Sequence, residues 1–450
     1  MDLLLWSLIT TSITISNGFS PLYSKQLLKG HDVSPEVFMN SVQLIIYNGY
    51  KAETHFVPTE DGFILGLHRI PYGRHDKPGE AIAPIAPLNG SFEAVGDTDL
   101  IKETVVSLNK DDDKLDENNN DDQQGSRPVV LLQHGLLADS SCYLFNGYNG
   151  SLGFILADAG YDVWLGNSRG NTYSMKHTKY NSTQEQFWDF SWQDMADKDL
   201  PAMVDYILKT TNQTNVVFIG HSQGTIIGFT GFSRNKQLAK KVKLFIALAP
   251  IAKLGDVRGL TSLLVKALKP NIDEVFTLFG RKGFFLNNSI NMDIADKICD
   301  TDASAYLCSE FTDLIYGHGL PNYDWRRVPV YMSHIPSGTS VRNMVHFGQG
   351  VISGEFQLYD FGTAVENMAR YNQTTPPYVN ITQVDVPVAI YSGGNDYLAD
   401  PTDVKFISDN LKHIVENKDY PKWNHADFVV GDTPPKTLYK DMLKLMGKLK

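Results

Sequence analysis

Along this chain, short apolar runs alternate with longer amphipathic stretches. The apolar runs lie at 129–132, 163–165, 216–219, 244–249 and 386–391. Such runs are typical of strands that are buried on both faces of a sheet. The stretches between them have helical periodicity. This alternation predicts an α/β fold with a mostly parallel central sheet and helices on both of its faces.

Three local patterns refine this prediction. Asp61-Gly62 separates two extended apolar runs and favours a β-hairpin across 55–68. The stretch 191–208 has the pattern of one long helix, with its apolar residues inward and Asp194, Asp197 and Asp199 outward. Residues 412–415 are the expected last strand, in which His413 is half-buried.

The alternation stops between residues 251 and 380. Amphipathic helical patterns dominate there, as at 260–268 and 296–316, and the strand pattern resumes only at Val386. A helical block between two strands predicts a cap or lid subdomain over the carboxyl ends of the strands, where α/β sheets bind their ligands. We therefore expect a core at 30–250, a helical cap at 251–380 and a second core segment at 381–450.

The negative charge is concentrated in one segment. The net charge is −11, and residues 76–127 hold thirteen Asp and Glu against five Lys and Arg. This tract has little to bury, so we expect an acidic, disordered insertion at 75–126. A calcium site there is disfavoured because the tract lacks the spaced ligands and the turn glycine of a calcium loop. The overall acidity argues against a nucleic-acid partner.

The N-terminus indicates the secretory route. An apolar run from Leu3 to Ile15 is short for a membrane span and suits a signal peptide at 1–19, with a buried N-terminal helix as the alternative. No other run is long enough for a transmembrane segment. Seven N-x-Ser/Thr sequons support a secreted or lysosomal protein. They begin at Asn89, Asn149, Asn181, Asn212, Asn287, Asn372 and Asn380.

Three cysteines are too few for a disulfide framework. Cys299 and Cys308 are nine residues apart in a segment of helical character, which allows one bridge across a small loop in an oxidising compartment. Cys142 would then be left over, and we expect it to be a small buried apolar side chain rather than a reactive thiol.

The motif Gly220-His221-Ser222-Gln223-Gly224 stands between a strand pattern and a helix pattern. A strand-to-helix turn this tight needs glycines beside the serine. It presents the hydroxyl at the carboxyl end of the sheet. We therefore predict that Ser222 is a nucleophile, the alternative being a tight structural turn.

A serine nucleophile needs a base, and the base needs an acid that orients it. In this arrangement the acid and then the histidine follow the serine along the chain. Asp396 comes directly after the strand at 386–391, and His425 lies in a loop after the last strand. Helix capping is an alternative role for Asp396, but Asp400 is better placed for it. We predict Asp396 as the acid and His425 as the base.

The oxyanion formed on acyl attack needs two backbone N–H donors. One should come from Gln223, directly after the nucleophile. The other should come from the loop that follows the strand at 127–133, where we choose Leu136. We expect His134 in the same loop to be structural rather than a proton-transfer group.

These motifs together resemble the acid lipase family, which includes gastric and lysosomal acid lipases and many insect and nematode relatives. The resemblance spans nearly the whole chain after the leader. It rests on motifs that include His68-Arg69-Ile70-Pro71-Tyr72-Gly73, Gln133-His134-Gly135-Leu136-Leu137, Gly166-Asn167-Ser168-Arg169-Gly170-Asn171, Gly220-His221-Ser222-Gln223-Gly224, Gly393-Gly394-Asn395-Asp396 and Asn424-His425.

The resemblance implies an α/β-hydrolase fold and the same triad, with oxyanion donors at Leu136 and Gln223. It also implies a cap disulfide with the spacing of Cys299 and Cys308. The expected function is hydrolysis of long-chain lipid esters, triacylglycerol or cholesteryl ester, at a lipid–water interface, with no metal and no organic cofactor. A small-ester carboxylesterase and a non-catalytic lipid-binding or yolk-type storage protein are the alternatives.

Overall fold

The computed structural model describes residues 34–75, 127–268, 279–285, 308, 312–318 and 322–448. Several sequence predictions fall outside these residues. They are the signal peptide at 1–19, the acidic insertion after His75, Cys299, and the sequons at Asn89 and Asn287.

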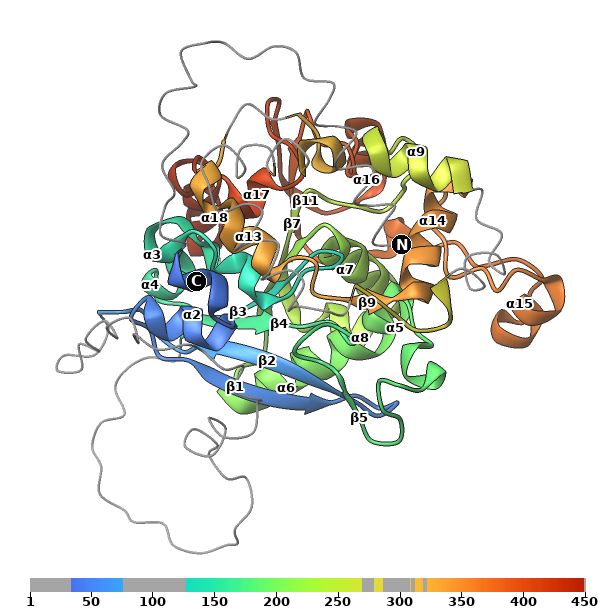
Figure 1. Ribbon diagram of the computed structural model, residues 1–450, viewed down its shortest axis with the longest axis horizontal. Coiled ribbons are helices and arrows are strands. Elements are labelled where there is room, and N and C mark those ends of the chain that lie inside the picture. Colours follow the sequence, from blue (N-terminus) through green and yellow to red (C-terminus); the bar gives the residue numbers. More distant parts are fainter. Residues whose placement is uncertain are drawn as a thin grey trace, which may run out of the picture.

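The described part of the chain is organised around one mixed sheet (Figure 1). Its order is β1-β2-β4-β3-β6-β7-β10-β11, with β5 paired to β2. From β4 to β11 all neighbours are parallel, whereas β2 runs antiparallel to β1, β4 and β5. This confirms the α/β prediction, and the β1–β2 pair confirms the predicted hairpin. The strands are β1 (Glu53–Pro58), β2 (Phe63–Ile70), β3 (Val129–Gln133), β4 (Asp162–Gly166), β5 (Lys176–His177), β6 (Val216–His221), β7 (Val242–Leu248), β10 (Val388–Gly393) and β11 (Ile414–Tyr420).

Helices pack against both faces of the sheet. In Figure 1, α4 and α18 lie together on one side of it, and α6 and α7 lie on the other. The helices of the core are η1 (Pro35–Phe38), α2 (Ser41–Tyr47), η2 (Ser140–Tyr143), α3 (Gly147–Gly150), α4 (Leu152–Asp158), η3 (Glu185–Trp188), α5 (Trp192–Asp194), η4 (Met195–Asp199), α6 (Leu200–Thr211), α7 (Gln223–Arg234), α8 (Lys236–Ala239), α16 (Pro401–Asn410), α17 (Asp427–Val430), η7 (Pro434–Lys436) and α18 (Leu438–Gly447).

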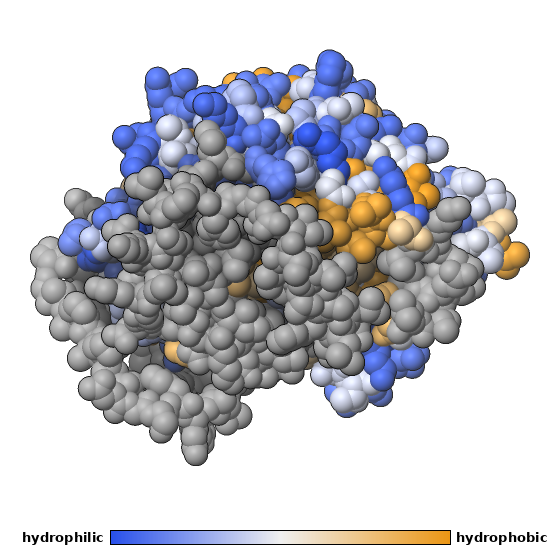
Figure 2. Space-filling model, turned by 45° about the horizontal axis from the view of Figure 1, so that its top comes forward, coloured by the Kyte–Doolittle hydropathy of each residue, from blue (hydrophilic) through white to orange (hydrophobic). Residues whose placement is uncertain are grey.

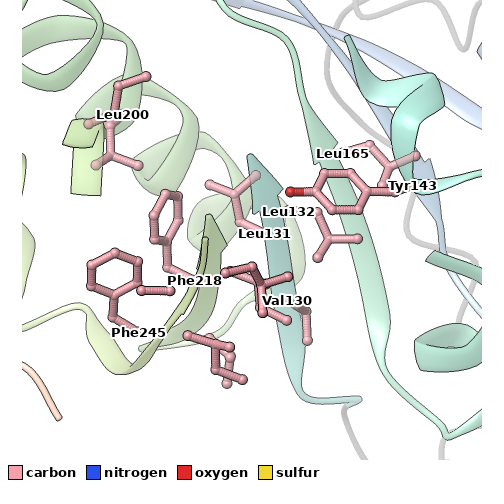
Figure 3. Close-up of a cluster of buried hydrophobic side chains, with 14 of the residues drawn as sticks. Val130, Leu131, Leu132, Tyr143, Leu165, Leu200, Phe218 and Phe245 are labelled. Carbon is pink, nitrogen blue, oxygen red and sulfur yellow. The ribbon is translucent and has the colours of Figure 1, made fainter. Parts of the chain in front are cut away.

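Aromatic and branched side chains pack around the central strands (Figure 3). Phe218 of β6 and Phe245 of β7 pack ring against ring, with centroids 5.3 Å apart. Tyr143 is also fully buried, and its hydroxyl donates to the Gln133 carbonyl at 2.8 Å, so its polar atom is satisfied. β3 and β6 are paired in parallel with Gln133 opposite Gly220, so their carboxyl ends lie side by side.

The predicted helix at 191–208 is three elements. A short α5 leads into the π-helix η4, and α6 begins with Pro201 near its N-terminus. Proline has no N–H to donate and so favours a new helix start. The predicted apolar face is buried as expected, but the outward position of Asp199 is wrong. Its carboxylate is 1% exposed and pairs with buried Arg169 at 2.6 Å.

The predicted last strand is also corrected. β11 runs from Ile414 to Tyr420, and His413 lies just outside it with 55% of its side chain exposed, beside Asp385. β11 is an edge strand whose residues are all half-buried or exposed. The apolar signal that marks inner strands is therefore weak here.

We call the described residues between β7 and β10 the inserted block. It follows the end of β7 and contains helices, two short strands and long loops. Gly259–Leu268 confirms the helical pattern expected at 260–268. The elements of the inserted block are α9 (Gly259–Leu268), β8 (Gly283–Phe284), η5 (Trp325–Arg327), α13 (Val328–His334), β9 (Thr339–Ser340), α14 (Val341–Ser353), α15 (Ala364–Tyr371) and η6 (Ile381–Gln383).

Candidate active site

Ser222 is the single residue between β6 and α7, and its backbone has a conformation that residues with a side chain rarely adopt. Its φ is 53° and its ψ is −118°. The flanking glycines explain how the turn closes. A Cβ on Gly220 would lie 2.7 Å from the carbonyl carbon of Gly224, and a Cβ on Gly224 would lie 2.3 Å from the Gln133 oxygen. The turn thus brings β3, β6 and α7 into backbone contact around the serine.

Asp396 and His425 lie 29 residues apart in the chain and are in direct contact. The Nδ1 atom of His425 is 2.8 Å from Oδ2 and 3.0 Å from Oδ1 of Asp396. Oδ1 also accepts from the backbone N–H groups of Leu398 and Ala399. Both side chains are almost completely buried. Since Nδ1 donates to the carboxylate, Nε2 of the imidazole is left as a proton acceptor.

His425 lies beside the serine turn. Its carbonyl accepts from Nε2 of His221, the residue before Ser222, at 3.0 Å, and the two rings are 5.0 Å apart. Burial is the largest cause that lowers the pKa of His221, to about 3. His221 is therefore a neutral donor that ties the histidine loop to the serine turn.

The loop 134–137 lies against Ser222. A Cβ on Gly135 would be 3.1 Å from Ser222 Cβ and 3.5 Å from its Oγ, so the loop approaches the hydroxyl at Gly135. His134 holds this loop: its Nδ1 donates to the Gly135 carbonyl, and its Nε2 accepts from Ser168 N–H at 3.0 Å. Burial lowers the pKa of His134. The expected structural role of His134 agrees with these bonds.

Gln223 is the first residue of α7 and is buried. Its side-chain Oε1 accepts from Asn343 Nδ2 at 2.7 Å, and its Nε2 lies 3.6 Å from the sulfur of Met195. The backbone of Gln223 begins the helix directly after the serine. Its N–H is one of the orphan donors of that helix end.

Other predicted residues lie away from this centre. Asp400 caps α16 by accepting from Thr402 N–H, as expected. Cys142 is free and buried, and burial raises the pKa of its thiol well above the usual range, which fits the expected apolar role. Cys308 is disulfide-bonded. The described sequon asparagines are all exposed: Asn149, Asn181, Asn212, Asn372 and Asn380.

Within the described ranges, no group of three or more His, Cys, Asp or Glu side chains is placed to hold a metal ion. None of the helices described is both long enough and apolar enough to cross a membrane.

The fold and the Ser222, Asp396 and His425 site indicate a class of enzyme, and comparison with known proteins supports the same class. A family model described as "alpha/beta hydrolase fold" matches residues 128–276, and one described as "Partial alpha/beta-hydrolase lipase region" matches residues 41–147. The protein is thus an α/β hydrolase of the lipase or esterase kind.

Its relatives narrow the class further. The chain is 39% identical to human gastric triacylglycerol lipase over 99% of both proteins. It is 40% identical to human lipase member N, over 98% of this chain and 99% of that protein. Human lysosomal acid lipase/cholesteryl ester hydrolase is 39% identical over 92% of each. The chain belongs to the acid lipase family.

The sequence did not predict the residues that hydrogen-bond to the loops of the site without being predicted site residues themselves. His221 fixes the histidine loop, and Asn343 holds the Gln223 side chain. The carbonyl of Tyr316 accepts from the backbone N–H of His425 at 3.2 Å. His221 is inside the serine motif and could have been suspected. Nothing in the local pattern of Tyr316 or Asn343 distinguishes them from structural residues of a helical block.

Proposed function

We propose that this protein hydrolyses carboxylic esters of long-chain lipids through Ser222, Asp396 and His425. The observation that carries the proposal is a buried Asp–His pair hydrogen-bonded at 2.8 Å and tied to a serine turn of positive φ. Family membership supports the same reaction class. The names of the relatives point to triacylglycerol or cholesteryl ester as the substrate.

In the proposed reaction, Ser222 Oγ attacks the ester carbonyl and its proton passes to His425 Nε2. Asp396 holds the imidazole through Nδ1 and stabilises the cation. The backbone N–H groups of Leu136 and Gln223 would donate to the oxyanion, each contributing roughly 3 kcal/mol of barrier reduction. His425 then returns the proton to the leaving alcohol. Water, activated by the same histidine, hydrolyses the acyl-enzyme and restores the serine.

The surface supports a lipid substrate. Most of the large apolar side chains that the described residues expose belong to the inserted block, and Figure 2 shows apolar surface gathered in one area. Exposed apolar area of this kind suits contact with a lipid–water interface. We propose the inserted block as the cap of the site. The exposed apolar residues of the block are Leu263, Leu264, Phe285, Leu314, Ile352, Val365, Met368 and Tyr378.

Labelling with a fluorophosphonate probe tests the nucleophile. The native protein should be labelled, and Ser222→Ala should lose the label with no change in melting temperature beyond a few degrees. A native protein that takes no label would overturn the proposal and favour a lipid-binding or storage protein on the same fold.

An ester series distinguishes a lipase from an esterase. Activity on a long-chain triacylglycerol emulsion or on cholesteryl ester should rise sharply above the solubility limit of the ester. Saturation below that limit, with short-chain esters preferred, would show a carboxylesterase instead. The series should be run from acid to alkaline pH on the same preparation.

We also propose a secreted or lysosomal protein that carries N-linked glycans on some of its exposed sequons. The gastric and lysosomal relatives support this location. Treatment of the protein from a eukaryotic host with an N-glycosidase should increase its mobility in denaturing gels. An unchanged mobility would contradict the glycan proposal.

A further inference from the structure

Two segments of the inserted block contact the loops that carry the proposed catalytic groups. The first, residues 312–318, is called here the acid–base clamp. The second, residues 337–343, is called the oxyanion strap. Both make backbone or buried side-chain contacts with the loops that carry Asp396, His425, Leu136 and Gln223.

The acid–base clamp lies between the two loops of the Asp–His pair. The Tyr316 carbonyl accepts from the backbone N–H of His425 and from that of Tyr397, each at 3.2 Å. The Gly317 carbonyl accepts from Asn424 Nδ2 at 3.0 Å. Two consecutive carbonyl groups therefore join the residue after Asp396 to the histidine loop.

Gly317 also approaches the acid loop very closely. Its φ is +111°, and a Cβ added there would lie 1.9 Å from the carbonyl oxygen of Asn395. Only glycine allows this contact, so the clamp and the acid loop are fitted to each other at backbone level.

The oxyanion strap contacts the loop of one proposed oxyanion donor and the side chain of the other. Ser337 N–H donates to the Leu137 carbonyl at 2.7 Å, and Ser337 Oγ donates to Asp139 Oδ2 at 2.6 Å, so the strap is bonded to the loop of Leu136. At its other end Asn343, with no exposed surface, donates to Gln223 Oε1 at 2.7 Å.

Further hydrogen bonds fix the side chain of Asn343. Its Oδ1 accepts from Trp192 N–H at 2.7 Å, and its Nδ2 also donates to Thr339 Oγ1 at 3.0 Å. An amide with both ends bonded cannot rotate freely, so it fixes the side chain of Gln223 and with it the first turn of α7.

We propose that the clamp and the strap are positioning parts of the active site, with Asn343 and Gly317 as positioning residues. The clamp holds the acid against the base, and the strap aims the two oxyanion donors. This inference rests on the catalytic roles proposed above.

The strap is tested with Asn343→Ala and Asn343→Asp on a water-soluble short-chain ester, which avoids effects of lipid binding. Both variants should lower kcat by roughly 10- to 100-fold, the scale of a small misplacement of catalytic groups, with KM changed less than about twofold. Asn367→Ala is the matched control. Asn367 is also a buried amide of the inserted block, but its bonds go to Phe361 and Asp360, away from the site.

The pH profile of Asn343→Asp separates positioning from general stability. An ionised carboxylate cannot donate to Gln223 Oε1, whereas the protonated form can. The activity of this variant relative to the native protein should therefore rise as the pH falls from about 8 to about 5. Arg342 nearby is paired with Asp189, and burial lowers the pKa of His346 to about 3, below this range.

The clamp is tested with Gly317→Ala against Gly354→Ala. Both glycines lie in the inserted block at positive φ, but a Cβ on Gly354 would meet only Gly255 Cα at 3.6 Å. Gly317→Ala should lower kcat by about 100-fold or more, and Gly354→Ala should leave kcat unchanged. Near-ultraviolet circular dichroism checks that each variant is folded. If Gly317→Ala does not fold, the Asn343 variants alone decide the proposal.

Equal losses of kcat in Asn343→Ala and Asn367→Ala, or a pH-independent relative activity of Asn343→Asp, would overturn the positioning role. So would full activity of folded Gly317→Ala. Fluorophosphonate labelling of the native protein shows whether the proposed function itself has failed. A native enzyme that is labelled, together with Asn343 and Gly317 variants of unchanged activity, contradicts only the positioning roles of these two residues.

Discussion

Ser222 and its neighbours show how much of the site is decided by single residues. The serine has φ 53° because β6 must turn into α7 within one residue. Gly224 makes the turn possible, since any side chain there would meet the backbone of β3 at Gln133. Strain at a functional residue is retained because the surrounding sheet determines its conformation.

Gly224→Ala should therefore destabilise the fold by about 2 kcal/mol or more, because the new methyl group would overlap a backbone oxygen that cannot move independently. Denaturant unfolding measures the effect. Gly447→Ala is the control, because a Cβ at that position in α18 meets nothing within 4 Å and alanine favours helix. An unchanged free energy of unfolding in Gly224→Ala would contradict the close contact between the serine turn and β3.

Asp396→Asn tests the proposed acid. Its remaining Oδ1 can still accept from Leu398 and Ala399, so the loop should keep its shape. The new amide would instead donate to His425 Nδ1 and favour the wrong tautomer. We expect kcat to fall by about 10³- to 10⁴-fold with little change in KM. A decrease of less than tenfold in steady-state assays would contradict the role of Asp396 as the orienting acid.

At the scale of elements, two ion pairs of buried Arg169 join three parts of the core. Arg169, after β4, bonds to Asp199 of η4 and to Asp61 of the β1–β2 hairpin. Burial raises the pKa of Asp199, and the charge and hydrogen bonds of Arg169 oppose that rise. The network locks the hairpin and the π-helical turn onto the loop after β4.

Asp199→Asn should destabilise the protein by about 3 kcal/mol, because it leaves a buried guanidinium with only one carboxylate partner. The exposed pair Lys405–Asp409 supplies the comparison: Asp409→Asn should cost less than about 0.5 kcal/mol. Denaturant unfolding of both variants tests the difference. Equal effects would show that the Arg169 network adds no more than a surface ion pair.

At the scale of the whole molecule, buried titratable groups make the stability of the fold depend on pH, and they do so in opposite directions. Burial lowers the pKa of His68 to about 4 and those of His221 and His346 to about 3. The unfolded chain would bind protons on these histidines near pH 6.5, so acidification below that value removes stability. Asp427, two residues after His425, acts in the other sense, since burial raises its pKa to about 7.

Asp427→Asn should therefore make the protein more sensitive to acid. Between about pH 4 and pH 7 the folded state holds a proton on Asp427 that the unfolded chain has lost, so acidification through this window stabilises the native protein. The variant keeps an oxygen that can accept from Asn424 N–H. Its melting temperature should fall more steeply from pH 7 to pH 4.5 than that of the native protein. A parallel decline would contradict the raised pKa of Asp427.

The parts of the fold that could be predicted are those with strong local signals. The buried strands β3, β6 and β7, the hairpin and the serine turn follow from unbroken apolar runs and glycine placement. The end of β11 and the division of the helix at 191–208 were missed. An edge strand has a weak apolar signal, and a π-helical turn depends on the fold around Arg169 rather than on its own residues.

The sequence by itself determined the α/β class, the strand–helix alternation and which residue types stand at the carboxyl ends of the strands, because backbone sterics and apolar periodicity are local properties. Only the tertiary structure decided that residues 312–318 and 337–343 of a separate block reach the loops of His425 and Gln223. Those contacts depend on how distant segments pack against one another, and no period or motif along the chain records that packing.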